Sequence, residues 1–506
     1  MNKTPTKEQL SILLQHFQSE RFDEAEKLAK LITKEFPNHY FGWKVLGAVM
    51  KDVGKINEAL DAMKKSVELE PKDPESYNNL GVIQKDLGKL NESRISFSQA
   101  IALNPDDAEA YSNLSLVNRE LGRLEEAKKN CLQAISLKPD LAEAYNNLAL
   151  ILQRMGKIEE AEANYLQAIS LKPDLSEPHN NLGTVFEEKG KLEEAKGWYA
   201  KAILLDPNYY LAINNIGNIY KKMGRLEEAR ENFKKVIELQ PTYIDSLWNL
   251  STSEGKIDNA EYWLNEILKI KVNHLPSKLM KAAFRFYMGD KNYFNSLMQS
   301  EHSQHPYMRS FSWVFSLKNL PELYFNRWHF FDAIVKKTII SKPFYEFGVW
   351  NGASFKYLIK NYKQGYGFDT FEGLPEDWQI GRNIEKKGKY SSEGNVPQIT
   401  GGEFIKGKFE DTLPIFFSED RPIASLINFD ADLYSSTICA LNFTKKIIDK
   451  DTILIFDELI MNESWEEDEF KALNEFCSIN KFNYEVLAVS FFSKQVAVKL
   501  TDKKDV

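Results

Sequence analysis

The sequence predicts an all-α superhelix of paired helices followed by a mostly parallel α/β sheet with helices on both faces. Two observations indicate this architecture. A period of 34 residues runs through the first half of the chain, and from about Pro321 short apolar runs alternate with helical segments. We therefore expect three parts: a repeat superhelix at 1–272, a helical connector at 273–320 and an α/β region at 321–506.

Composition narrows the class of protein. A chain of 506 residues suggests two to four domains, and 43% hydrophobic residues suffice for large cores. The net charge of −8 gives no support for nucleic-acid binding. No stretch approaches the roughly 18 apolar residues of a membrane span, and the N-terminus lacks the apolar core of a signal peptide. The cysteines, Cys131, Cys439 and Cys477, lie far apart and suit a reducing compartment, so we expect a cytoplasmic protein.

The repeat is defined by registered positions. Prolines recur every 34 residues, at Pro37, Pro71, Pro105, Pro139, Pro173, Pro207 and Pro241. Small residues in the first helix, such as Gly47 and Gly81, allow close helix approach, and the proline ends the second helix because it has no N–H to donate. This pattern resembles the tetratricopeptide repeat. Such pairs stack into a superhelix with a concave groove, and the array decays after Leu247.

A ladder of asparagines follows the same period. It consists of Asn79, Asn113, Asn147, Asn181, Asn215 and Asn249. An amide both donates and accepts hydrogen bonds, so a row of amides can bind an extended peptide without reading its sequence. The row resembles the asparagine ladder in the repeat domain of the O-linked N-acetylglucosamine transferase family, which implies a protein or peptide partner in the groove. Alternatively, the amides bond neighbouring helices.

The second half begins with a predicted helix, followed by seven predicted strands that are separated by helical segments. The helix is 316–340, and the strands are 343–350, 365–371, 403–409, 423–430, 452–457, 483–491 and 495–500. Only the short turn "FSKQ" separates the last two strands, which indicates a hairpin and an antiparallel edge strand.

Acidic residues follow two of these strands. Asp430 and Asp432 come after one apolar run, and Asp457 and Glu458 come after another. Since the carboxyl ends of parallel strands form the ligand side of such a sheet, these acids indicate a cation or a donor-rich ligand. Asp432 could alternatively cap the helix that we expect to begin near Ser435.

Two further strand ends carry binding signals. The glycine turn "FGVWNGAS" can bring backbone N–H groups close to a ligand, and Glu346 lies at the end of its strand. Asp369 ends the next strand, where an acid suits ribose hydroxyls. Trp350 and Trp378 could stack on a substrate or simply pack. We interpret the acidic run "ESWEEDEF" as a solvated first helical turn.

Five motifs, in this order, carry a family resemblance. They are "YEFGVWNGAS", "GFDTFEGLPE", "GKFEDTLP", "INFDADLYSST" and "ILIFDEL". Together they resemble the macrocin and mycinamicin O-methyltransferase family, within the class I S-adenosylmethionine methyltransferases, over roughly residues 320 to 500. The resemblance implies a Rossmann-like sheet, S-adenosylmethionine as cofactor, and Mg²⁺-assisted methylation of sugar hydroxyls.

The resemblance also implies residue roles. The cofactor would be held by Glu346, Gly348, Asn351, Gly352 and Ser354, with Asp369 at its ribose. The metal ligands would be Asp430, Asp457 and Glu458. The family usually has two aspartates followed by tyrosine where this chain has Asp457, Glu458 and Leu459, which leaves the metal geometry and the substrate open.

The leading hypothesis is a Mg²⁺-assisted O-methyltransferase acting on a sugar, glycan or natural-product hydroxyl, with the repeats as a docking arm. The last histidine is His329, which argues against a histidine base, so Asp430 or Asp432 could take the proton. One alternative is an inactive scaffold protein. A weaker alternative is a glycosyltransferase, for which the second half is short.

Overall fold

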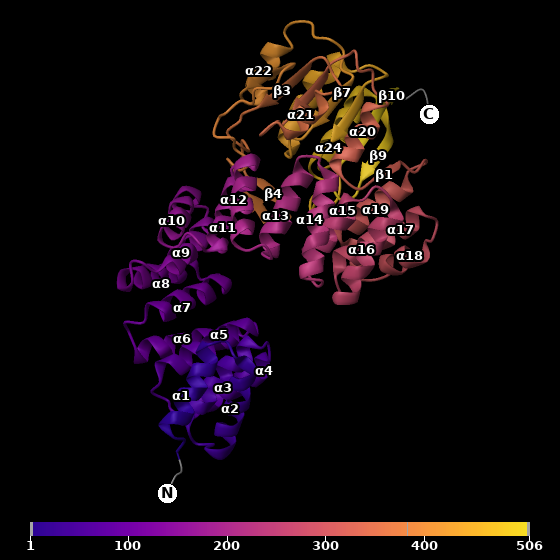
Figure 1. Ribbon diagram of the computed structural model, residues 1–506. Helices are drawn as coiled ribbons and strands as arrows, with labels where there is room; N and C mark the ends of the chain where they lie inside the picture. Colours follow the sequence, from indigo (N-terminus) through magenta and orange to yellow (C-terminus); the bar gives the residue numbers. More distant parts are fainter. Residues whose placement is uncertain (1–3, 382, 503–506) are drawn as a thin grey trace. The chain divides into compact units, whose positions relative to one another are not determined.

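The computed structural model describes residues 4–381 and 383–502 and divides into two compact units (Figure 1). One unit comprises residues 1–186 with 204–207, and the other comprises 187–203 with 208–506. The division falls within the repeats. The last repeats therefore belong to the same compact unit as the sheet.

The first unit is built from antiparallel helix pairs. Its helices are α1 (Lys7–Gln18), α2 (Phe22–Glu35), α3 (Tyr40–Asp52), α4 (Ile56–Leu69), α5 (Pro74–Asp86), α6 (Leu90–Leu103), α7 (Ala108–Glu120), α8 (Leu124–Leu137), α9 (Ala142–Arg154), α10 (Ile158–Leu171) and α11 (Ser176–Glu188). The second helix of each repeat stops just before its proline, as α4 does before Pro71. The turn within a repeat uses a glycine in the left-handed region, for example Gly54 at φ 77°.

The helical part of the second unit continues beyond the repeats. It contains α12 (Leu192–Leu205), α13 (Tyr210–Lys222), α14 (Leu226–Leu239), α15 (Ile244–Ser253), α16 (Ile257–Ile270), α17 (Leu275–Tyr287), α18 (Asn292–Met298), the 3₁₀ turn η1 (Glu301–Gln304) and α19 (Pro306–Ser316). Helix α15 has 10 residues where α13 has 13, so the short first helix predicted after Leu247 is present. Phe284 and Phe311, from the expected connector, are fully buried in the same core as the sheet.

A mixed sheet of eight strands follows. Its strands are β1 (Glu322–Tyr324), β2 (Phe344–Phe347), β3 (Gly365–Asp369), β6 (Gly402–Lys406), β7 (Leu426–Phe429), β8 (Ile453–Phe456), β9 (Phe482–Ser490) and β10 (Val496–Asp502). Their order is β1-β9-β10-β8-β7-β2-β3-β6. Strand β10 runs antiparallel to both β8 and β9, whereas the other pairs in this sheet are parallel.

Successive side chains along the strands point to opposite faces of the sheet and contribute to two hydrophobic cores. Phe344 of β2 packs on one face with Phe330 and Phe355, which come from α20 (Arg327–Val335) and α21 (Ala353–Leu358). Phe347 of β2 lies in the other core, which includes residues of α22 (Phe409–Phe416), α23 (Tyr434–Thr444) and α24 (Glu469–Asn480). Side chains that alternate between faces therefore place helices on both sides of the sheet (Figure 1).

Two predictions about the sheet were wrong. The helix predicted at 316–340 contains β1, because Glu322–Tyr324 pairs with β9 and only α20 is helical beyond it. Strand β10 is antiparallel as predicted but is not an edge strand, since it lies between β8 and β9. A small ribbon of β4 (Trp378–Ile380) and β5 (Asn383–Glu385) was not predicted.

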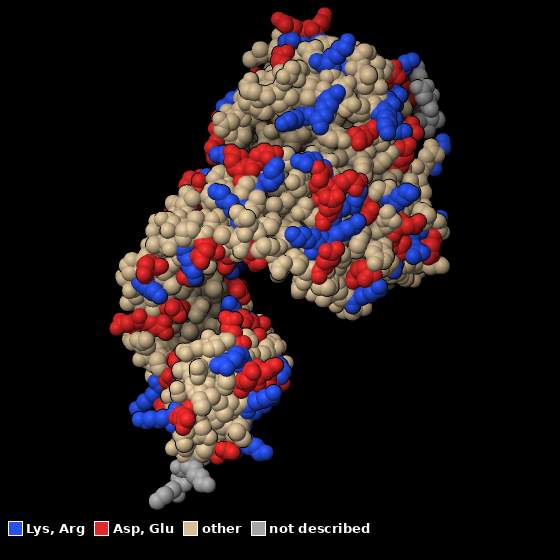
Figure 2. Space-filling view, in the orientation of Figure 1, with Lys and Arg blue, Asp and Glu red and all other residues tan. Residues whose placement is uncertain are grey.

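The acidic run "ESWEEDEF" also differs from the prediction. Trp465, Asp468 and Glu469 are buried, with 3%, 8% and 1% of their surfaces exposed. The run leads into α24, and its Glu469 accepts a hydrogen bond from the backbone N–H of Glu458, which follows β8. The surface is otherwise mixed: on the face shown in Figure 2, acidic and basic side chains lie interspersed. Within the described ranges, no helix combines the length and apolar character that a bilayer crossing requires.

Close helix packing in the repeats gives a stability prediction. A Cβ at Gly217 of α13 would lie 2.5 Å from the ring of Phe233, which is fully buried in α14. Gly217→Ala should therefore lower the melting temperature through overpacking that costs about 1–3 kcal/mol. Gly197→Ala is the matched control, because a Cβ there meets nothing within 4 Å on an exposed helix face and should stabilise slightly. Equal melting curves for both variants would contradict this packing.

Candidate functional site

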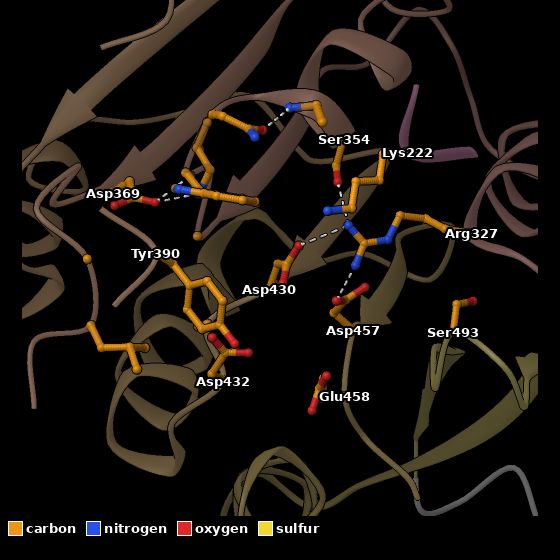
Figure 3. A pocket seen from close by; sticks show the side chains of 18 of the residues that line it. Lys222, Arg327, Ser354, Asp369, Tyr390, Asp430, Asp432, Asp457, Glu458 and Ser493 are labelled. Carbon is orange, nitrogen blue, oxygen red and sulfur yellow. Dashed lines mark hydrogen bonds and ion pairs between the residues drawn. The ribbon is translucent and has the colours of Figure 1, made fainter. Parts of the chain in front are cut away.

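A cavity of about 540 Å³ lies at the carboxyl ends of β2, β3, β7 and β8 (Figure 3). Loops from these strands form one side, and residues of α12, α13 and α15 form another. Strand order reverses at β2, which has β3 on one side and β7 on the other. Open α/β sheets hold their ligands at such a reversal, and the volume lies within the range of roughly 300–1,000 Å³ found for small-molecule sites.

Most of the predicted site residues meet at this cavity. Those that line it are Gly348, Asn351, Ser354, Asp369, Asp430, Asp432, Asp457 and Glu458. Glu346 and Gly352 belong to the same region but are not among the lining residues. The proposed roles of all these residues remain predictions.

The two glycines serve the packing of the chain. Gly348 has φ 88°, and a Cβ there would lie 1.8 Å from the backbone oxygen of Asp430. Gly352 has φ 76°, and a Cβ there would lie 3.0 Å from Ile399. Gly348 therefore requires glycine because of the Asp430 backbone, and Gly352 favours glycine because of its left-handed φ, whether or not a ligand approaches.

Asp369 organises the loops at the end of β2 and β3. One carboxylate oxygen accepts hydrogen bonds from the backbone N–H groups of Val349 and Trp350, both at 2.7 Å. The other oxygen accepts from the N–H of Phe371 at 2.6 Å. Trp350 is held in the left-handed region at φ 47°, which a residue with a side chain rarely adopts. The Thr370 hydroxyl is a fourth and weaker donor, 3.5 Å from the second carboxylate oxygen, so it is the donor that a ligand hydroxyl could most easily replace.

A group of acids lies at the ends of β7 and β8. Asp430 and Asp432 follow β7, Asp457 and Glu458 follow β8, and Glu469 joins them from α24. Burial, reinforced by the charge of Asp457, raises the pKa of Asp430 well above its ordinary value. Burial, reinforced by Glu458, does the same to the pKa of Asp432. The side chain of Asp432 does not cap α23, whose N-cap is Leu433, and its backbone lies at φ 59°.

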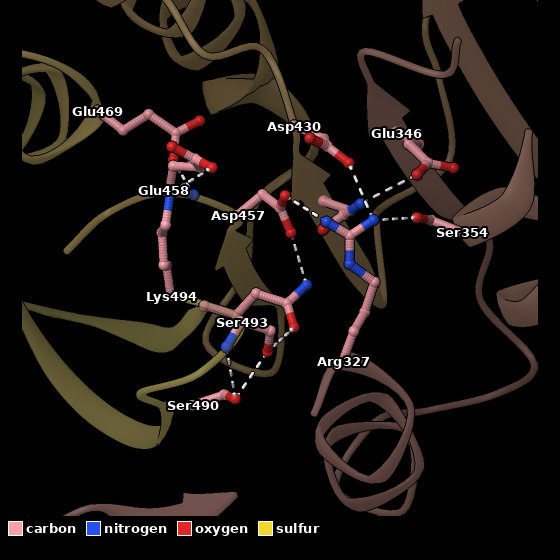
Figure 4. Close-up of polar contacts among 12 residues, drawn as sticks. Arg327, Glu346, Ser354, Asp430, Asp457, Glu458, Glu469, Ser490, Ser493 and Lys494 are labelled. Atoms are coloured by element: carbon pink, nitrogen blue, oxygen red, sulfur yellow. Dashed lines mark hydrogen bonds and ion pairs between the residues drawn. The ribbon is translucent and has the colours of Figure 1, made fainter. Parts of the chain in front are cut away.

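Two cations compensate part of this negative charge (Figure 4). The guanidinium of Arg327, at the start of α20, forms an ion pair with Asp457, lies 3.7 Å from Asp430 and donates to Ser354 Oγ at 3.1 Å. Lys494 pairs with Glu458 at 2.9 Å. These pairs leave the cluster with more acids than cations, which is why burial and repulsion both oppose ionisation of Asp430 and Asp432.

The arrangement does not fit a bound Mg²⁺ as it stands. Both oxygens of Asp457 are engaged, one by Arg327 and the other by Gln495 Nε2 at 2.6 Å. Lys494 takes one oxygen of Glu458. Over residues 4–381 and 383–502, no group of three or more His, Cys, Asp or Glu side chains is placed to hold an ion. Binding of Mg²⁺ by Asp430, Asp457 and Glu458 therefore stays a prediction, and the positive charge present comes from Arg327.

Glu346 lies beneath the cavity. Its side chain is 1% exposed, and Asn428 donates to one of its oxygens at 3.0 Å. The other oxygen is buried without a hydrogen-bond partner in the described structure. Burial raises the pKa of Glu346 to about 8, so a proton on this carboxyl is favoured at neutral pH. A cofactor contact by Glu346 stays a prediction.

Tryptophans from several parts of the chain line the cavity: Trp248, Trp328, Trp350 and Trp378. Trp378 is 3% exposed and packs with Leu374 and Leu433, while Trp350 donates weakly to the backbone oxygen of Ser391 at 3.3 Å. Trp350 and Trp378 thus pack against the protein and also face the cavity. Packing and stacking on a substrate, the two roles left open by the sequence, are therefore compatible.

The predicted asparagine ladder bonds neighbouring repeats. In the first unit, Asn113 donates to Asn78, Asn147 donates to Ser112, and Asn181 donates to Asn146, at 2.9–3.2 Å. In the second unit, Asn249 donates to Asn218 at 2.9 Å and accepts from Lys221 at 2.7 Å. This is the alternative role that the sequence left open, and peptide binding by the ladder stays a prediction.

Several site residues carry no local sequence signal. Arg327 is 130 residues from Asp457, and Lys494 is 36 residues from Glu458. Glu469 lies in a run that reads as an exposed helix start. The sequence signal for cations such as Arg327 and Lys494 was indirect: the acids at the strand ends indicated that a positive charge was needed nearby.

The pKa of Glu346 gives a prediction about stability and pH. Its folded-state value of about 8 lies above its ordinary 4.5, so folding takes up a proton in this interval, and the stability that this carboxyl contributes is lost as the pH rises from about 4.5 to about 8. The stability of Glu346→Gln relative to wild type should therefore increase with rising pH, by about 1 kcal/mol or more, or by roughly 2–4 °C in Tm. Glu403→Gln, at an exposed strand position, should show no such trend in parallel thermal melts at pH 5 and pH 8.5. If the stability difference between Glu346→Gln and wild type is equal at both pH values, Glu346 is ionised in the folded protein.

Comparisons with known proteins concern the repeats. Family models described as tetratricopeptide repeat match residues 62–95, 106–174, 140–207 and 210–243. The matched residues end before the sheet begins. No curated protein sequence matches the chain.

Several of the solved structures that resemble the chain are described as tetratricopeptide repeat proteins. The APC/C hetero-tetramer Cut9–Hcn1 shares 18% identity over 55% of this chain and 55% of that chain, with a TM-score of 0.44. Yeast Tom70 shares 19% over 56% and 63%, also at 0.44. TTC0263, a thermophilic TPR protein in Thermus thermophilus, shares 24% over 36% and 98%, at 0.33. The chain thus spans about half the length of the first of these, and the family-model matches identify its 34-residue units as tetratricopeptide repeats.

Proposed function

We propose that the α/β region binds S-adenosylmethionine and transfers its methyl group to a hydroxyl of a sugar, glycan or natural product. The observation that carries this proposal is the cavity at the reversal of strand order, lined by the loop after β2, by Asp369 and by the acids after β7 and β8. The repeats would bring a protein or peptide partner, since tetratricopeptide repeats present binding surfaces of this kind.

Strand order supports a doubly wound fold. Numbered along the chain from β2, the strands β6, β3, β2, β7 and β8 stand in the order 3-2-1-4-5, as in doubly wound nucleotide-binding sheets. The antiparallel strand β10, which lies between β8 and β9, belongs to the same region of the chain as the motifs that resemble class I methyltransferases. Both features favour a Rossmann-like interpretation of this region.

The cavity residues suit the proposed cofactor. Asp369 fixes the backbone of Val349 and Trp350 with one oxygen. A ribose hydroxyl could replace the weak Thr370 donor, 3.5 Å away, on the other oxygen. Asn351 Oδ1 accepts from the N–H of Ala353, which shapes the turn into α21. Bound there, S-adenosylmethionine would supply an electrophilic methyl group. The chain's part is to hold both reactants in line, which provides much of the rate in such a displacement.

The acids after β7 suit the removal of a proton. In methyl transfer a carbon–oxygen bond forms, the carbon–sulfur bond breaks, and the hydroxyl proton must leave, with S-adenosylhomocysteine as the second product. Asp432 lines the cavity, and the raised pKa of its carboxyl makes it a stronger base than an exposed aspartate. Asp430 lies nearer Arg327 and is the second candidate. Because the oxygens of Asp457 and Glu458 are engaged, no step is assigned to a metal ion.

Calorimetric titration of S-adenosylmethionine into the full-length protein tests the proposal. Wild type should bind, and Asp369→Asn should weaken binding at least tenfold, about 1.4 kcal/mol, because in either orientation the amide N–H₂ would face a backbone N–H, of Phe371 or of Val349 and Trp350. Asp411→Asn, exposed on α22, is the matched control and should bind as wild type does.

The same titration with and without MgCl₂ tests the metal prediction separately. Heat from Mg²⁺ alone that disappears in Asp457→Asn would establish a metal site. A folded wild-type protein that does not bind S-adenosylmethionine would contradict the proposal and favour the scaffold alternative.

A further inference from the structure

We propose that the last tetratricopeptide repeats form the acceptor-binding wall of the cavity, and that Lys221 binds a phosphate group carried by the acceptor. This inference extends the proposed function and depends on it in one respect, that the bound molecule is a methyl acceptor. The binding site itself is argued from the contacts of Lys221 and can be tested without any turnover.

The repeats contribute directly to the cavity. Leu192 of α12, Lys221 and Lys222 of α13, and Trp248 and Thr252 of α15 are all lining residues. They lie in the same compact unit as the sheet. Side chains of these last repeats therefore form part of the cavity wall, in addition to any protein partner that the array binds elsewhere.

This wall is held in place by specific contacts. Trp328 Nε1, from α20, donates to the backbone oxygen of Lys221 at 2.6 Å. A Cβ at Gly224 would lie 3.2 Å from the Trp328 ring, so the turn after α13 packs directly on this indole. Trp248 meets Phe492 edge to face at 5.3 Å between ring centroids. The wall is thus part of the folded core.

Lys221 differs from the other cations that line the cavity. Its ammonium donates to Asn249 Oδ1 at 2.7 Å and to Thr252 Oγ1 at 3.2 Å, and both partners are neutral. Among the described lining residues, the remaining cations Lys222, Arg327 and Lys408 each pair with a carboxylate, at Glu187, Asp457 and Glu410. Burial, with the nearby charge of Lys222, lowers the pKa of Lys221 to about 8.

An ammonium in this setting favours an anionic ligand. Removal from water without a counter-charge is costly, and a bound anion would relieve that cost. Lysine acts as a compact point charge toward phosphate, and Thr252 provides a hydroxyl beside it. The strand-end acids line the same cavity, and like charge would keep a phosphate away from them. A phosphate bound at Lys221 would therefore leave the neutral part of the acceptor to face these acids.

The test is calorimetric titration of three probes into the full-length protein: glucose 1-phosphate, glucuronate and glucose. We expect glucose 1-phosphate to bind, and Lys221→Gln to weaken it at least tenfold. Lys221→Arg should keep the affinity within a few-fold, because it keeps the charge. Lys234→Gln, at an exposed position of α14, is the matched control and should change nothing.

Three outcomes would overturn the inference. They are the absence of glucose 1-phosphate binding to folded wild type, equal losses in Lys221→Gln and Lys221→Arg, and binding that depends on Lys221 for glucuronate but not for glucose 1-phosphate. If Lys221→Gln fails to fold, the affinity of Lys221→Arg and protection of wild type against thermal unfolding by glucose 1-phosphate decide instead. Binding of this probe without binding of S-adenosylmethionine would support the phosphate site while rejecting the methyltransferase proposal.

Discussion

The ion pair of Arg327 with Asp457 is the interaction on which the cavity depends. Asp457 is 6% exposed, and a buried carboxylate without a counter-charge is strongly destabilising. The pair also positions α20, because Arg327 is its first residue and the next residue, Trp328, donates to the backbone of Lys221 in α13. Two consecutive side chains thus connect the acids at the strand ends to the wall formed by the repeats.

This connection makes the last repeats part of the cavity wall. Tetratricopeptide repeats indicate protein or peptide partners, and the first unit carries the full pattern of paired helices for such binding. In the second unit, the same helical architecture encloses a cavity and contributes lysines and a tryptophan to it. A partner held by the first repeats and an acceptor held by the last would then be recognised by one continuous array of related sequence units.

Local patterns predicted much of the fold. The spacing of the prolines placed the ends of the repeat helices, since proline cannot continue a helix. Each of the seven predicted strands overlaps an observed strand, because buried parallel strands appear as short apolar runs between turn residues. Strand β1 could not be predicted in this way, because its three residues are extended only through pairing with β9, more than 160 residues away. The position of β10 inside the sheet likewise depends on β8 and β9 together.

For the candidate site, the sequence by itself determined which acids gather: Asp430, Asp432, Asp457 and Glu458 follow adjacent parallel strands, and strand direction alone brings such ends to one edge. Only the tertiary structure decided which cation compensates the charge of these acids. Arg327 is 130 residues from Asp457, and Trp328 is 107 residues from Lys221. Contacts at such separations follow from how α20 and the last repeats pack against the sheet, because the pairing of buried charges is set by three-dimensional proximity and not by any spacing along the chain.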